Sequence, residues 1–399
     1  MFPWAGPLAT IRPPAGRSHA PPLRLDAAHD RMASNDPSSS QAAAGPPVST
    51  HAPAFLRALK VAALLVVSLY LFILGLELIK AGAKPLGSWI QALGVDSVKG
   101  ALGLGWLLAC VVLSGSPVAA FSLGLLDTEK LDVYQSFAMI NGSRLGASFV
   151  VLVVGFLYDR RTRRETGGVY VGALALITTA TVYIPAFGLG YVALKAGWFE
   201  GIRFGLPSEI ESFLDLILKP VARGLGEVLP AWSLAILGIV AIVGAFKLFD
   251  GFLPVVDPTG GRLSKMATTI YRPWITFVFG MLVTSITLSV SVSLTLLVPL
   301  TARGLVRREN LIPYILGANI TTFVDTLFAS LLLKNPAGFT VVFCEICAVS
   351  AFSLPIVFLA YRPYERVVDE LALKVTRSRF RLGLFVMGLF LIPILLIWI

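Results

Sequence analysis

The sequence predicts an all-α polytopic membrane protein with two inverted-topology repeats, each carrying a re-entrant hairpin and an interrupted helix, followed by a C-terminal helix. Three observations predict this class. The chain of 399 residues is 56% hydrophobic and only 14% charged. Its charged residues gather between long apolar runs, so the net charge of +10 indicates membrane orientation rather than nucleic-acid binding. A polar stretch, LSGS at 113–116, recurs as LSVS at 288–291 inside two of these runs.

Residues 1–52 are rich in Pro, Ala and Ser, and we expect them to form a disordered tail. They contain no apolar run long enough for the core of a signal peptide. Nine apolar segments follow, at 61–79, 101–126, 135–157, 168–194, 230–249, 275–300, 311–333, 338–360 and 382–399. Because a spanning helix needs about 20 residues, each segment is a candidate to cross the membrane.

The basic loops predict how the chain is threaded. The basic stretches are 159–164, 262–272, 303–309 and 361–381. The positive-inside rule assigns all of them, with the N-terminal tail, to the cytoplasmic side of the cell (inner) membrane. Two of them flank the single segment 275–300, so this segment should enter and leave on the cytoplasmic face. Segment 101–126 precedes an acidic loop, 127–132, and should do the same from the outer face.

An internal repeat includes both polar stretches. Residues 113–148 and 288–323 align without a gap, although only six positions are identical. The first serine precedes a glycine by 28 residues in both copies, Ser114 before Gly142 and Ser289 before Gly317. Each glycine begins a polar island, GSRLGAS or GANITT. Loop charges direct the first island helix inward and the second outward, and such inverted repeats with interrupted helices are typical of secondary transporters.

The two hairpin tips predict a binding site. Irregular backbone survives in the bilayer core only where it is buried in protein or lines a wet cavity. Ser116 is a suitable N-cap and Pro117 a suitable first helical residue, so the helix after the first tip would direct its free N–H groups at an anion. Carbonyl and hydroxyl oxygens freed by the breaks would suit a hard cation such as sodium.

This reading gives the chain six parts. They are a tail (1–52), a first membrane repeat (53–197), an extracytoplasmic amphipathic connector (198–229), a second, inverted membrane repeat (230–361), a cytoplasmic basic segment (362–381) and a C-terminal transmembrane helix (382–399).

At these motifs the sequence resembles the type II sodium-dependent phosphate cotransporters and their bacterial relatives. That family carries a Q-S-S-S motif in each of two inverted re-entrant hairpins, followed by a helix with a G-A-N-I-G-T-like motif. LSGS, LSVS, GSRLGAS and GANITT occupy these places, and LFILGLELIKAG (71–82) is similar to the family's first helix. The resemblance spans roughly residues 60 to 360. The chain departs from the family at Leu113, Gly115, Arg144, Leu288, Val290 and Thr321, which marks it as a divergent member.

The resemblance and the tip chemistry together imply a set of ligand residues. They are Ser114, Gly115, Ser116, Asn141, Arg144, Ser289, Ser291, Asn319, Thr321, Thr322 and Asp325. The implied function is secondary transport of an inorganic anion, with sodium-coupled phosphate symport as the first expectation. The alternatives are another substrate, or a degenerate fold that acts as a scaffold or regulatory partner without transport. The expected partners are phosphate or a similar anion, sodium or a proton, and the lipid bilayer, with no cofactor, no nucleic acid and no enzymatic motif.

Arg144 leaves three interpretations open. It aligns with Asn319 across the repeats, and its charge cannot be shed at neutral pH. It would form a buried ion pair with Asp325 or Glu345, hold an oxyanion bidentately, or stand as a fixed charge in place of a sodium ion.

Overall fold

The structure of the chain is a computed structural model that describes residues 54–82, 96–162, 167–202, 204, 208–252, 272–302, 306–332 and 335–398. All regular elements in these ranges are helices. The predicted tail at 1–52 and the basic stretch at 262–271 lie outside the described residues.

Seven helices or helix pairs of the described chain are long and apolar enough to cross a membrane. They are α1 (Ala54–Ala81), α5 with α6 (Val133–Ala147 and Phe149–Thr162), α7 (Gly168–Lys195), α9 (Ala231–Phe252), α14 with α15 (Leu311–Thr321 and Val324–Leu331), α16 (Ala337–Phe358) and α18 (Arg379–Trp398). They coincide with seven of the nine predicted segments. The chain is therefore an integral membrane protein with a helical fold, as the sequence predicts.

The other two apolar segments are broken into shorter helices. The first gives α3 (Val98–Val112) and α4 (Ser116–Asp127), and the second gives α11 (Pro273–Thr287), α12 (Val290–Thr295) and α13 (Leu297–Ala302). The first helix of each ends at a leucine in the left-handed backbone region, with φ 57° at Leu113 and 48° at Leu288. Because this region is unfavourable for residues with a Cβ atom, both breaks carry strained backbone at the start of LSGS and of LSVS.

Glycines hold each broken segment against the next long helix. The close contacts are Gly105 with Met139 and Gly142 with Leu102 between α3 and α5, and Gly280 with Tyr314 and Gly317 with Phe277 between α11 and α14. A Cβ atom added at any of these glycines would lie 2.0 to 2.2 Å from the facing carbonyl oxygen. The second set of contacts is the first set shifted by 175 residues, as from Gly142 to Gly317. Both pairs of helices therefore pack in parallel and in the same register.

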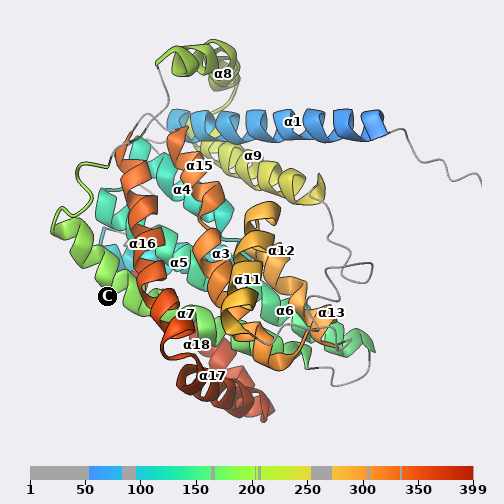
Figure 1. The fold of residues 1–399 in the computed structure, drawn as a ribbon. Coiled ribbons are helices and arrows are strands. Elements are labelled where there is room, and N and C mark those ends of the chain that lie inside the picture. Colours follow the sequence, from blue (N-terminus) through green and yellow to red (C-terminus); the bar gives the residue numbers. More distant parts are fainter. Residues whose placement is uncertain are drawn as a thin grey trace, which may run out of the picture. The chain divides into compact units, whose positions relative to one another are not determined.

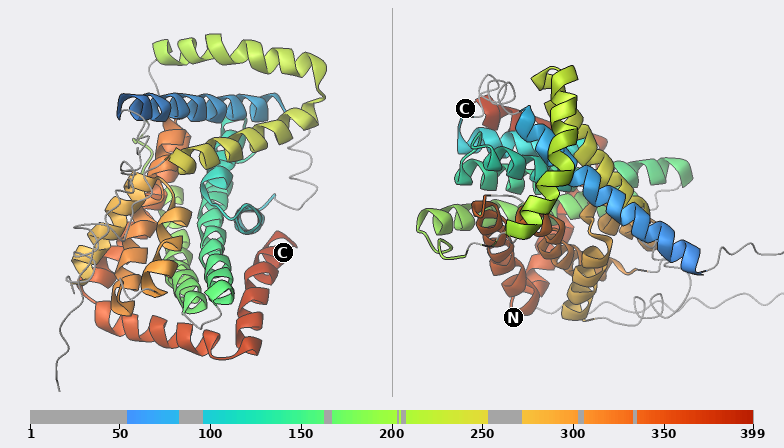
Figure 2. Two further views of the ribbon diagram at one scale, coloured as in Figure 1. Left: turned by 90° about the vertical axis from the view of Figure 1, so that its right-hand side faces the viewer. Right: turned by 90° about the horizontal axis from the view of Figure 1, so that it is seen from above.

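Helices α1 and α9 cross at two more glycines. A Cβ atom at Gly75 would lie 2.8 Å from the carbonyl oxygen of Gly238, and one at Gly238 would lie 2.7 Å from that of Gly75. The crossing falls on two similar sequences, LFILG at 71–75 and LAILG at 234–238. Helix α8 (Ser208–Val228), part of the predicted amphipathic connector, packs on α1. The three helices lie together at one end of the other helices (Figures 1 and 2).

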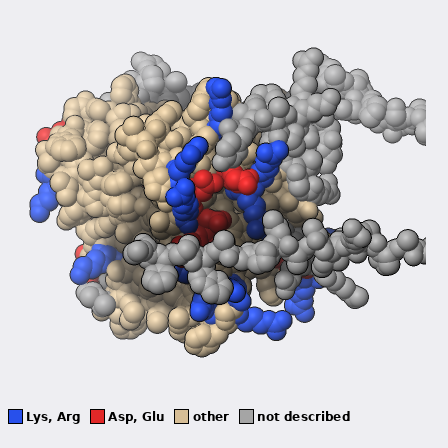
Figure 3. Space-filling view, turned by 60° about the horizontal axis from the view of Figure 1, so that its bottom comes forward, with Lys and Arg blue, Asp and Glu red and all other residues tan. Residues whose placement is uncertain are grey.

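Three of the basic stretches meet on one face of the helices. The guanidinium of Arg308 lies over the ring of Tyr170, in the first turn of α7, at 5.1 Å. The hydroxyl of Tyr361, the first residue of α17 (Tyr361–Thr376), donates to the carbonyl of Glu309 at 2.6 Å. Figure 3 shows Lys and Arg side chains on this face. We call it the basic face.

The acidic loop at 127–132 lies at the opposite end of the helices from the basic face. The ammonium group of Lys80 forms ion pairs with Asp127 at 2.8 Å and with Glu77 at 2.9 Å. The side chain of Gln135, at the start of α5, donates to the carbonyl of Asp96, just before α3, at 3.0 Å. The start of α3 and the start of α5 therefore lie side by side, and the short acidic loop joins α4 to that same start of α5.

The α11–α13 segment has its ends toward the basic face. Helix α11 is parallel to α14, which begins beside the basic stretch 306–310. The return segment ends nearby, because the backbone N–H of Val306 donates to the carbonyl of Leu300 at 3.4 Å. The start of α3 thus lies beside the start of α5, and the end of the α11–α13 segment lies close to the residues that precede α14.

This arrangement predicts a labelling pattern for cysteines placed on the two faces. In Lys130→Cys and Arg307→Cys, both at exposed positions, we expect an impermeant thiol reagent on whole cells to modify position 130 only. Position 307 should react after the membrane is permeabilised. The unsubstituted chain is the control, since its cysteines lie in or beside the membrane helices. Modification of both positions from outside would contradict the assignment of opposite faces.

Candidate functional site

The centre of the candidate site is the guanidinium of Arg144 in α5, a residue that is 2% exposed. Its Nη1 donates to the hydroxyl of Ser116 at 3.4 Å and to that of Thr322 at 3.2 Å. Its Nη2 donates to the hydroxyl of Thr326 and lies 3.7 Å from Oδ1 of Asp325. We call these five residues the Arg144 cluster. It joins α4, α5 and the break between α14 and α15.

Interruptions in two long helices make room for this cluster. Helix α5 ends before Ser148, and α14 ends before the pair Thr322 and Phe323. Ser148 follows Ser114 by 34 residues, and Phe323 follows Ser289 by the same number, so the interruptions are equivalent in the repeat alignment. The ring of Phe323 lies 4.8 Å from the guanidinium carbon, where it adds a cation–π contact.

The first tip places backbone directly beside the guanidinium. A Cβ atom at Gly115 would lie 2.9 Å from the carbonyl oxygen of Ser143 and 3.3 Å from Nη1 of Arg144, so a larger residue would displace the cluster. The prediction that Ser116 is the N-cap of the following helix is wrong. Gly115 precedes the helix, no side chain caps it, and Ser116 is its first residue, followed by Pro117. The reason is that the Ser116 hydroxyl accepts from Arg144 instead of from a backbone N–H.

The second tip touches the first. The hydroxyl of Ser291 donates to the carbonyl of Leu113 at 3.3 Å, which connects the two breaks directly. Ser289 caps α12 by accepting from the N–H of Val292 at 3.3 Å. Ser114 is half-buried beside this contact. Residues 178 positions apart in the sequence therefore form one joint.

A second group of buried polar residues lies next to the cluster. Asn141, one helical turn before Arg144, donates to Oε2 of Glu345 at 3.1 Å and to the carbonyl of Tyr183 at 3.4 Å. The hydroxyl of Tyr183 donates to the carbonyl of Asn319 at 2.8 Å. These bonds link α5, α7, α14 and α16 around the site.

The structure brings together only part of the predicted ligand set. Ser116, Arg144, Thr322 and Asp325 meet in the cluster, Gly115 and Ser114 lie at its edge, Asn141 and Asn319 belong to the neighbouring polar group, and Ser289 and Ser291 shape the second tip. Thr321 points elsewhere, because its hydroxyl donates to the carbonyl of Met281 in α11 at 3.1 Å.

Sequence reasoning missed one member of the cluster, Thr326, and left the partner of Arg144 open. Thr326 belongs to no motif, but it follows Thr322 by four residues, a spacing that places two hydroxyls on one side of the chain. Of the two acidic residues weighed as partners, the structure pairs Arg144 with Asp325. Glu345 is bonded to Asn141 instead.

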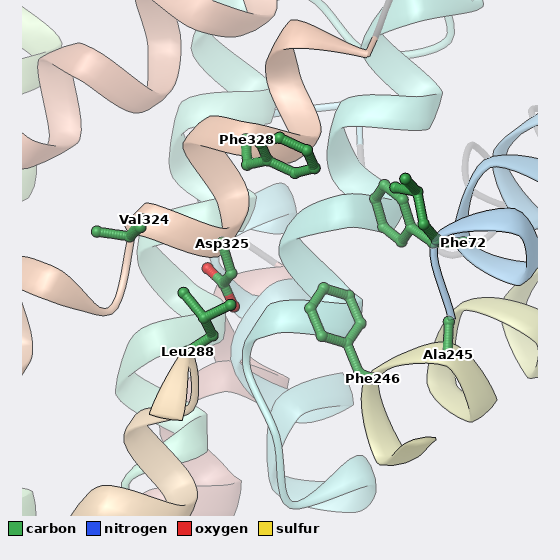
Figure 4. A pocket seen from close by; sticks show the side chains of 8 residues that line it. Phe72, Ala245, Phe246, Leu288, Val324, Asp325 and Phe328 are labelled. Atoms are coloured by element: carbon green, nitrogen blue, oxygen red, sulfur yellow. The ribbon is translucent and has the colours of Figure 1, made fainter. Parts of the chain in front are cut away.

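An apolar pocket of about 260 Å³ opens beside Asp325 (Figure 4). It is lined by Leu69, Phe72, Ala245, Phe246, Leu288, Val324, Asp325 and Phe328. Asp325 is the only charged residue of this lining. Its Oδ2 atom is buried and has no hydrogen-bond partner among the described residues. The Nε atom of Arg144 is likewise buried without a hydrogen-bond partner among the described residues. The site thus holds an unpartnered guanidinium N–H and, beside it, a carboxylate with free acceptor capacity.

These features define an integral membrane protein with a charged site buried where broken helices meet. The family model described as Na+/Pi-cotransporter matches residues 255–393, which include the second break and the GANITT island. Over these residues the chain is similar to that family, whose description is that of a transporter. Neither the comparison with curated proteins nor that with solved structures gives a match.

The Arg144 cluster predicts a specific stability pattern. We expect Arg144→Met to lower the stability of the purified protein by about 3–5 kcal/mol, because it leaves the buried carboxylate of Asp325 without its cation. Adding Asp325→Asn should restore much of the loss. Lys374→Met is the control, since Lys374 forms an ion pair with Glu370 at an exposed position. Thermal unfolding in detergent measures the stability of the wild type, Arg144→Met, the double variant and Lys374→Met. A double variant as unstable as Arg144→Met would contradict a structural ion pair.

Proposed function

We propose that the chain is a sodium-coupled phosphate symporter whose site lies between two re-entrant hairpins that enter from opposite sides of the membrane. The observation that carries the proposal is the buried guanidinium of Arg144, held between the first break and the interruption between α14 and α15. The Na+/Pi-cotransporter match, which covers the second break, suggests phosphate as the transported anion.

Matching contacts support the inverted repeat. The glycine contacts of α3 with α5 recur between α11 and α14 at a constant shift, and so do the left-handed leucines at the breaks. We infer that the two broken segments enter the membrane from opposite faces. Two copies of one unit, inserted in opposite directions, would produce this pattern.

Phosphate would bind to the guanidinium of Arg144. Its unpartnered Nε and the Nη2 atom, once released from Asp325, would present two parallel N–H groups to two phosphate oxygens. Helix α4 is twelve residues long and begins at Ser116, beside the guanidinium. Its first turn adds backbone N–H groups and the positive end of the helix. The present ion pair with Asp325, at 3.7 Å, is longer than a hydrogen bond, so the guanidinium can exchange this partner for an anion.

Sodium would bind to the carboxylate of Asp325. The residue offers an unpartnered Oδ2, and the Thr326 hydroxyl lies 2.8 Å from Oδ1. Such oxygen ligands suit a hard cation. A sodium ion at Asp325 would neutralise the carboxylate that competes with phosphate for Arg144. Each ion would thus favour the binding of the other, which is the condition for symport.

Uptake of labelled phosphate into proteoliposomes tests the proposal. We expect the wild type to take up phosphate only with an inward sodium gradient. Ser116→Ala should raise the phosphate concentration for half-maximal uptake about ten- to a hundredfold, because one hydrogen bond at a charged site contributes roughly 1.5–3 kcal/mol. Ser233→Ala, at the start of α9, is the matched control.

Arg144→Asn separates the interpretations of this residue. If Arg144 binds the anion, the variant should need more phosphate at unchanged sodium dependence. If its charge replaces a sodium ion, the variant should become more dependent on sodium. Folded wild type that moves no phosphate under any sodium gradient would overturn the proposal and favour a scaffold without transport, or another substrate if a different anion is taken up.

A further inference from the structure

Glu345 of α16 is a fully buried carboxylic acid without a cationic partner. Its exposed fraction is 0%, and no ion pair to it occurs among the residues that the structure describes. Arg144, whose charge acts on Glu345, is engaged by Asp325. A lone carboxylate inside a membrane protein is expensive, because neither water nor an opposite charge compensates its lost hydration.

Two unpartnered oxygens, one on Glu345 and one on Asn141, indicate what compensates the buried acid. The Asn141 amide nitrogen donates to Oε2 of Glu345 at 3.1 Å. The remaining oxygen of each group, Oε1 of Glu345 and Oδ1 of Asn141, is buried and has no hydrogen-bond partner among the described residues. A carboxamide and a carboxylic acid form a ring of two hydrogen bonds, N–H to one oxygen and O–H to the other. One proton on Oε1 would complete this ring and satisfy both oxygens.

Burial favours this neutral form of Glu345, because the ionised form would lose its hydration. Arg144 of α5 acts on Glu345 by its charge, and Asp325 of α15 offsets that charge. The phenol of Tyr183 in α7 and the thiol of Cys344 in α16 are both buried and neutral at ordinary pH. None of these groups therefore supplies the positive charge that the proton on Glu345 would supply.

We propose that Glu345 is a proton-binding site, completed by Asn141, whose occupancy controls anion binding at Arg144. Asn141 and Arg144 are one turn apart on α5, so loss of the proton places a negative charge beside the anion site. Phosphate would then bind less well. The link to transport rests on the proposed function, whereas proton binding by Glu345 does not.

Infrared spectra of the purified wild type and variants, taken as differences from one another, test proton binding by Glu345 without any transport assay. We expect the C=O stretch of a protonated acid at neutral pH in the wild type, its loss in Glu345→Gln, and its retention in Glu370→Gln, a control at an exposed position. Glu345→Gln should still fold, because its amide can donate to Asn141. A wild-type spectrum equal to that of Glu345→Gln would overturn the proposal. So would loss of the band on adding sodium at constant pH, which would assign the site to sodium.

Phosphate uptake at rising pH then tests the link to Arg144. Once Glu345 ionises, uptake by the wild type should fall up to about tenfold per pH unit relative to Glu345→Gln. The comparison at each pH removes the effect of the changing charge of phosphate itself. Equal pH profiles, with the infrared band present, would overturn the control of anion binding. Absence of uptake in both proteins would instead contradict the proposed function and leave the infrared result standing.

Discussion

The buried charge of Arg144 is the constraint on which the rest of the site depends. A guanidinium keeps its proton at any physiological pH, so within a membrane protein it needs acceptors and a counter-charge. No single regular helix can supply them, because its backbone carbonyls are already bonded. The chain meets this need by breaking helices. Hydroxyls of Ser116, Thr322 and Thr326, with the carboxylate of Asp325, converge on Arg144 from two separate interruptions.

Close backbone packing makes this convergence possible. Without a hydrophobic driving force between helices in lipid, small residues allow the tight contacts that hold helices together. Gly142 and Gly317 serve this purpose at equivalent places, each against a carbonyl of the preceding broken segment. The contact fixes the height of each tip relative to its partner helix. The hydrogen bond from Ser291 to Leu113 then joins the tips.

Hydropathy and loop charge predicted the membrane class, seven long helices and the two exceptional segments, because these depend on composition and length. Repeat alignment also singled out Arg144 and Asp325 as charges in equivalent helices. The sequence could not predict which residues these two charges contact. Whether Arg144 meets Asp325 or Glu345 depends on how α5 and α15 are rotated, and Thr326 carries no signal apart from its spacing to Thr322. Ser116 is a residue type that often caps helices, but its hydroxyl accepts a hydrogen bond from Arg144 instead. This is a tertiary contact, which local sequence preferences cannot predict.

The proposed anion site depends on the contact between the two tips. A cross-link between the tips tests it most directly: cysteines at Leu113 and Ser291, positions joined by a 3.3 Å hydrogen bond, should form a disulfide under mild oxidation. We expect the cross-linked protein to lose phosphate uptake and to regain it on reduction, while each single variant is unaffected by the oxidant. A cross-link that leaves uptake intact, or two cysteines that never join in folded protein, would contradict it.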